Sequence, residues 1–81
     1  MITDEVLKDV YLERENQNIK WKREPGVWDR PPGIKYLVLG EEVGEVARAI
    51  LENDSTEHLY QELIQVAAVS VAWAESLKTK L

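Results

Sequence analysis

The chain has 81 residues, which is enough for one small domain with a limited hydrophobic core, and 44% of them are hydrophobic and 31% charged, as in folded proteins. Its net charge of −5 argues against a nucleic-acid polymer as the main partner, because binding to a phosphate backbone requires a basic surface. The absence of cysteine excludes disulfides, thiol catalysis and cysteine-based zinc sites.

The N-terminus, the longest apolar run and the single histidine limit the expected cellular location and the expected kind of metal site. The polar, acidic N-terminus has no feature of a signal peptide, and the longest nearly apolar run, residues 66–74, is too short to span a bilayer. We therefore expect a cytoplasmic protein with no membrane partner. The only histidine, His58, excludes a histidine-rich metal site, and we expect it to be a solvated surface residue.

The first predicted helix covers residues 3–20. Thr3 and the acidic residues after it are typical of a helix start. One apolar face is formed by Ile2, Val6, Leu7, Val10 and Tyr11. Arg14 and Gln17 continue this face, and Trp21 follows, so a ligand pocket can open at its polar end. Alternatively, Arg14 pairs with a nearby acid and Gln17 caps the helix end.

Residues 22–31 interrupt the helical pattern with proline and glycine turn signals. The segment is either a lid over a site or a simple connection between helices, and the sequence leaves both open. Trp28 within it more often packs such a loop against the protein than stacks on a base, so we expect it to be a packing residue.

The second predicted helix covers residues 32–52. At about 100° per residue, its apolar side chains form one stripe, with Glu42 inside the stripe and Glu45 at its edge. Buried like charges at this spacing require a cation, and hard divalent ions such as Mg²⁺ prefer carboxylate oxygens. Lys35 shares the stripe; it either extends to solvent or lies beside a metal or phosphate, and we favour the second.

The third predicted helix covers residues 55–78, with Asp54 or Ser55 as its N-cap. Glu62 lies within the apolar stripe of this helix and Gln65 lies at its border. Each of the two later helices therefore presents an acid and a second oxygen-bearing side chain three residues apart. Side by side, they would bring four oxygen ligands to one point.

Residues 66–74 are apolar on nearly every side of the third helix, and a three-helix chain cannot cover them alone. We therefore predict an all-α fold in which residues 1–81 form one domain. Helices 2 and 3 would form a four-helix bundle with a second chain in an obligate homodimer. The sequence leaves open whether two dimers associate further.

The chain resembles the MazG-like all-α nucleoside triphosphate pyrophosphohydrolases from about Glu13 to Leu77. The resemblance is carried by Glu41-Glu42-x-x-Glu45 and by the motif headed by Glu62. LVLGEEVGEVARAI and QELIQVAAVSVAWAESL are similar to the family's second and third helices, and ERENQNIKW is similar to a short, often phage-encoded subgroup.

The resemblance implies hydrolysis of nucleoside triphosphates to a monophosphate and pyrophosphate with Mg²⁺, or Mn²⁺ in its place. It assigns metal binding to Glu42, Glu45, Glu62 and Gln65, catalytic roles to Glu41 and Lys35, and nucleotide binding to Arg14, Gln17 and Trp21. In the family pattern an aspartate occupies the position of Gln65, so this chain lacks one negative charge and is expected to bind metal more weakly. The alternative is a non-catalytic dimeric helical module with a degenerate metal site, which binds a nucleotide or a protein.

Overall fold

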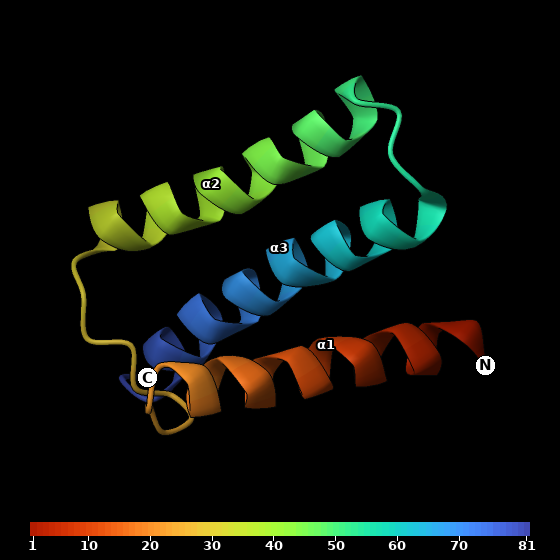
Figure 1. The fold of residues 1–81 in the computed structure, drawn as a ribbon. Helices are drawn as coiled ribbons and strands as arrows, with labels where there is room; N and C mark the ends of the chain where they lie inside the picture. Colours follow the sequence, from red (N-terminus) through yellow and green to blue (C-terminus); the bar gives the residue numbers. More distant parts are fainter.

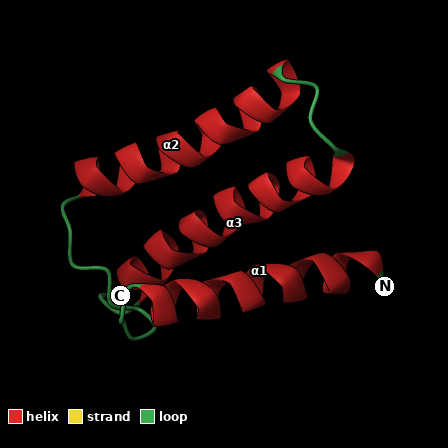
Figure 2. Ribbon diagram, viewed as in Figure 1, coloured by secondary structure: helices red, strands yellow, loops and turns green.

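The computed structural model describes residues 1–81 as three α-helices without strands (Figures 1 and 2), which confirms the all-helical prediction. The helices are α1 (Ile2–Lys20), α2 (Pro32–Leu51) and α3 (Thr56–Lys78). In Figure 1, α3 lies between the other two, parallel to α1 and antiparallel to α2. No Cα atom of α1 lies within 8 Å of one in α2, so α3 holds the fold together.

Local sequence accounts for where the helices begin. Pro32 occupies the first turn of α2, where the missing N–H of proline has no cost. Ser55, rather than Asp54, caps α3, because its hydroxyl oxygen accepts a hydrogen bond from the backbone N–H of His58 at 3.1 Å. Asn53, in the turn before this cap, has a φ of 57°, a left-handed conformation that asparagine tolerates well.

The core is small and lies along α3, in two seams: one between α3 and α1, and one between α3 and α2. Val10 of α1 packs against Ile64 and Ala68 of α3, and partly buried apolar residues surround them. Val69 and Ala72 are also buried. The alanines allow neighbouring helices to approach α3 closely, so part of this Ala/Val-rich segment is buried against helices of its own chain.

Polar contacts complete both seams. Arg14 of α1 donates to Glu75 of α3 from Nε at 2.8 Å and from NH2 at 2.5 Å. Lys35 of α2 donates to the hydroxyl oxygen of Ser76 of α3 at 3.1 Å. Each of these contacts joins an outer helix to the C-terminal half of α3.

The buried face of α2 is narrower than the stripe that its sequence predicts. Lys35 and Ala49 are buried, whereas Ile34, Val43 and Ile50 are exposed. The reason is that only α3 packs on α2, and one helix covers a limited strip of another. Large apolar side chains therefore remain uncovered on the outer surface of α2, and Leu63 of α3 is half exposed. None of the three helices has the combination of length and apolar composition needed to cross a bilayer.

Candidate metal and nucleotide site

A hollow of about 670 Å³, which we call the acid cavity, is lined by side chains from all three helices. Its carboxylates are Glu13 of α1, Glu42 and Glu45 of α2, and Glu62 of α3. Its amides are Asn16, Gln17 and Gln65. The four predicted metal-binding residues thus line one cavity.

Glu42 is the carboxylate of this cavity whose pKa is shifted by its surroundings. Its pKa is raised from the usual value, first by desolvation and then by the negative charges of Glu62, Glu45, Glu41 and Glu13. The sequence placed Glu42 inside the apolar stripe, and in the structure its side chain is partly withdrawn from water. A positive charge brought into the cavity would therefore interact most favourably at Glu42.

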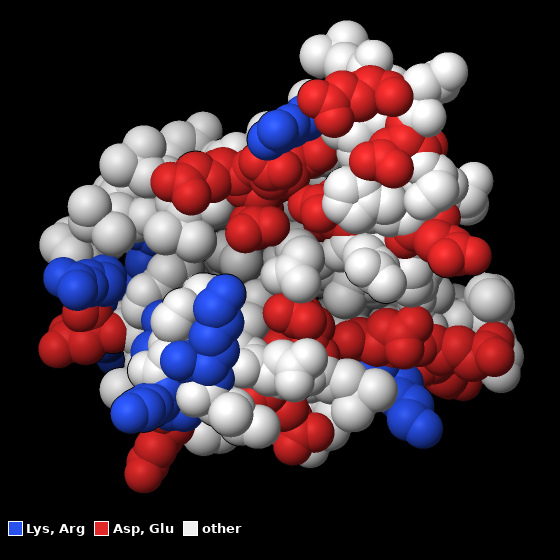
Figure 3. All heavy atoms as spheres, in the orientation of Figure 1, with Lys and Arg blue, Asp and Glu red and all other residues white.

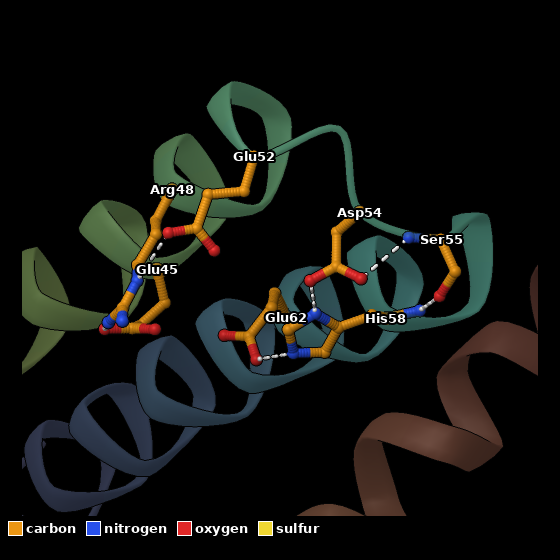
Figure 4. Close-up of polar contacts among 7 residues, drawn as sticks. All are labelled: Glu45, Arg48, Glu52, Asp54, Ser55, His58 and Glu62. Carbon is orange, nitrogen blue, oxygen red and sulfur yellow. Dashed lines mark hydrogen bonds and ion pairs between the residues drawn. The ribbon is translucent and has the colours of Figure 1, made fainter.

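Glu45 and Glu62 each pair with a basic side chain about one turn away on the same helix (Figure 4). Arg48 NH1 lies 3.7 Å from Glu45 Oε1, and His58 Nε2 lies 3.1 Å from Glu62 Oε1. The side chain of His58 is half exposed, as expected. Because its Nδ1 also contacts Asp54, the ring bridges two acids. The contacts with Asp54, and secondarily with Glu62, raise the pKa of His58.

The acid cavity is not arranged as a closed metal site. No group of three or more carboxylates and histidines lies close enough together to hold a metal ion. The predicted ligands share a cavity, but the tight convergence predicted from the sequence is not present, because Glu45 and Glu62 turn toward Arg48 and His58.

A second hollow, of about 610 Å³, lies beside the acid cavity and shares Gln17, Trp21 and Glu42 with it. We call it the indole cavity because Trp21 and Trp28 both line it. Its apolar wall is completed by Val27, Val38, Val69 and Ala72. Glu41 lines this second cavity rather than the acid cavity.

Basic side chains accompany the two indoles. Arg23 places its guanidinium carbon 4.9 Å from the ring centroids of both Trp21 and Trp28. Burial, and then the charge of Arg14, lowers the pKa of Arg23. Figure 3 shows the same polarity at the surface, since most basic atoms on that face gather at the end where α1 joins α2, and acidic atoms spread over the remainder.

Lys35 lies apart from the predicted ligands. It is only 3% exposed, its Nζ donates to the hydroxyl of Ser76, and it lies 5.9 Å from the ring centroid of Trp28. It lines neither cavity. Trp28 thus lies within cation–π distance of both Arg23 and Lys35.

Arg14 and Gln17 are both buried at the end of α1. Arg14 pairs with Glu75, which is the alternative that the sequence left open for it. Gln17 does not cap the helix with its side chain: its Oε1 accepts a hydrogen bond from Arg14 NH1 at 3.0 Å, and its Nε2 has no partner. Of the residues expected to bind nucleotide, Gln17 and Trp21 line both cavities and Arg14 lines neither.

Four residues of the acid cavity were not singled out from the sequence, namely Glu13, Asn16, Ile19 and Lys20 of α1. The signal for Glu13 was helical spacing, because it lies four residues before Gln17, which the sequence did single out, and Asn16 lies three residues after Glu13. Their use depends on the packing of α1 against α3, which periodicity alone does not reveal.

Comparison of the chain with models of protein families, with curated proteins and with solved structures gives no match.

Proposed function

We propose that this protein is a metal-dependent nucleoside triphosphate pyrophosphohydrolase, which releases pyrophosphate and a nucleoside monophosphate. The observation that supports this proposal is the acid cavity, in which carboxylates from three helices meet beside an apolar cavity with two indole rings. Mg²⁺ prefers carboxylate and amide oxygens, and a flat base fits an apolar, aromatic cavity.

The donor set fits a hard divalent cation in its chemistry. Glu42, Glu45 and Glu62 would hold Mg²⁺, or Mn²⁺, and Gln65 would add a neutral amide oxygen. For this, Glu45 must turn from Arg48 and Glu62 from His58. Neither partner prevents such a movement, because both ion pairs are partly solvent-exposed, and pairs of this kind contribute little to stability.

A bound metal supplies two things to this reaction: activation of water and neutralisation of the pyrophosphate leaving group. Glu41, which lies on the indole-cavity side of Glu42, would orient the water or hold a further ion. The apolar wall of the indole cavity would exclude solvent and orient the base. Lys35 would reach a phosphate only if its ammonium group left the hydroxyl of Ser76.

The proposal includes a homodimer in which α2 and α3 of two chains form a four-helix bundle. The supporting observation is exposed apolar surface on both helices, including Val43 and Ile50 of α2 and Leu63 and Leu77 of α3, each at least half exposed. An apolar surface of this kind is typical of an interface with another protein chain.

The test is pyrophosphate release from a panel of nucleoside triphosphates, with Mg²⁺ or Mn²⁺. We expect turnover with at least one substrate, and we expect Glu42→Gln to lower it about 100-fold or more, because it removes a ligand where charge develops. Glu57→Gln is the matched control, since Glu57 is an exposed glutamate of α3 that lines neither cavity, whereas Glu52 shares Arg48 with Glu45.

One observation favours a second candidate, a non-catalytic dimeric module that binds a nucleotide or a protein. No three carboxylates are close enough to share an ion, and Gln65 supplies no negative charge. If no triphosphate is consumed, while Glu42→Gln and Glu62→Gln each raise the melting temperature, the second candidate replaces the first. Stabilisation is the expected result when uncompensated, partly buried charges are removed.

A further inference from the structure

Gln17 carries a buried hydrogen-bond donor with nothing to bind. The residue is 2% exposed, and its Nε2 is the one buried side-chain nitrogen or oxygen in the chain without a hydrogen-bond partner. Leaving such a group unpaired costs its full desolvation penalty, and buried polar groups in folded proteins are nearly always satisfied. The orphaned donor therefore points to a partner that the chain itself does not provide.

The orientation of the Gln17 amide is fixed by its neighbour. Arg14 NH1 donates to Gln17 Oε1 at 3.0 Å, and an arginine side chain has donors only, so the NH₂ end of the amide cannot face it. Arg14 is itself held by Glu75 and Asn18. The carbonyl of Gln17 is thus occupied, and the group left free can donate but not accept.

The free donor lies where the two cavities meet. Gln17 lines both the acid cavity and the indole cavity, and so does Trp21. A ligand that reaches Gln17 from the indole cavity lies against Val69 and Ala72 of α3 and against the Trp21 and Trp28 side chains. A flat ring with an acceptor atom on its edge meets both requirements, apolar contact on its faces and a hydrogen bond at its rim.

We propose that Gln17 determines base specificity, by donating from Nε2 to the exocyclic carbonyl oxygen of a heterocyclic base in the indole cavity. The inference rests on the proposed function, which places the phosphates in the acid cavity. Bases with a carbonyl at this position, such as uracil and hypoxanthine, accept this hydrogen bond. In cytosine and adenine an amino group occupies the corresponding position, so donor would face donor, and the amide cannot turn over because Arg14 holds its oxygen.

The experiment compares binding within two matched pairs of nucleoside monophosphates, uridine against cytidine and inosine against adenosine. Titrations of the full chain, with and without Mg²⁺, are followed by tryptophan fluorescence, because Trp21 and Trp28 line the cavity. We expect the carbonyl-bearing member of each pair to bind about tenfold more tightly, the usual effect of one buried hydrogen bond gained or lost.

Two substitutions of Gln17 change the donor in different ways. Gln17→Leu removes the donor, so the two members of each pair should bind with about equal affinity. Gln17→Glu keeps one oxygen for Arg14 and presents the other as an acceptor, so the preference should shift toward cytidine and adenosine monophosphates. Gln61→Leu and Gln61→Glu are the matched controls, because Gln61 is exposed on α3 and lines neither cavity; both should retain the wild-type preference.

Equal affinities within both wild-type pairs, tighter binding of the amino-bearing bases or no binding at all would each overturn the inference, and none of these comparisons requires a variant to fold. A preference that survives in Gln17→Glu would also overturn it. The proposed function fails separately. Selective binding of the carbonyl-bearing nucleotides without any pyrophosphate release refutes only the activity. Pyrophosphate release at equal rates from nucleoside triphosphates of all bases refutes only the role of Gln17.

Discussion

At the scale of single residues, Glu42 is the side chain on which the charge of the acid cavity acts most strongly. Desolvation and four neighbouring glutamates raise its pKa above the usual value of 4.5. The folded chain therefore binds the Glu42 proton more tightly than the unfolded chain does. This contribution to stability is complete below pH 4.5 and is lost as the pH rises through the raised pKa.

The first prediction concerns this pH dependence. As the pH rises from 4.5 to 7, the melting temperature of Glu42→Gln should change less than that of wild type. At pH 7 without divalent metal, Glu42→Gln should melt at a higher temperature than wild type, because it lacks the ionised carboxylate. Thermal unfolding followed by circular dichroism at several pH values provides the measurement. Glu57→Gln should follow the wild-type profile, because Glu57 is exposed and lines neither cavity. A Glu42→Gln profile that also coincides with wild type contradicts the role given to Glu42.

The second prediction concerns the pair that holds Gln17 in place. Glu75→Gln leaves the buried guanidinium of Arg14 without its carboxylate, so the free energy of unfolding should fall by about 1–2 kcal/mol, after allowance for the partial exposure of Glu75. Urea denaturation measures the loss. The exposed Glu57 on the same helix is the control, and its replacement by glutamine should have little effect. An unchanged urea midpoint for Glu75→Gln would show that Arg14 does not depend on this pair.

At the scale of helices, the sequence predicted the three elements because each is long and turn residues separate them, and because α2 and α3 are amphipathic. It also placed Glu42 on the buried side of α2, since one helix fixes the direction of all its side chains. Periodicity could not place Lys35, because its long stem reaches Ser76 on another helix. Nor could it show that Glu13 and Asn16 join the cavity, which depends on how α1 packs.

The connection between α1 and α2 gives the third prediction. Gly26 has a φ of +79°, and a Cβ there would lie 2.8 Å from Thr79 Cγ2 at the end of α3. Gly26→Ala should therefore lower the free energy of unfolding by about 1–2 kcal/mol, mostly from backbone strain. Gly33→Ala is the control, because its helical position has open space and alanine favours helix. If both variants unfold at the same urea concentration, the connection is not held as the structure shows it.

At the scale of the whole molecule, the chain has a small core relative to its surface. Buried apolar residues number six, and none of the large side chains is fully buried. Chains of this size bury a smaller fraction of their surface than larger proteins do, so additional stabilisation from a second copy is expected. The sequence alone indicated this need from residues 66–74, but it could not show which apolar side chains the single chain leaves exposed.

The fourth prediction tests the dimer. Leu63 of α3 and Leu7 of α1 are exposed to a similar degree, 51% and 59%. If α2 and α3 form the interface, Leu63→Glu should shift the protein from dimer to monomer at micromolar concentration, whereas Leu7→Glu should leave it dimeric, because a charge at the centre of an apolar interface is strongly unfavourable. Sedimentation equilibrium measures the mass. A monomeric wild type, or dissociation by both variants alike, would contradict this arrangement.

The central claim is that the acid cavity holds a divalent cation, and calorimetric titration of Mg²⁺ or Mn²⁺ into the nucleotide-free protein tests it most directly. We predict saturable binding to wild type and to Glu57→Gln, and at least tenfold weaker binding to Glu42→Gln and Glu62→Gln, roughly the effect of losing one charged ligand. Equal binding, or equal absence of binding, in wild type and in the two cavity variants would contradict the claim.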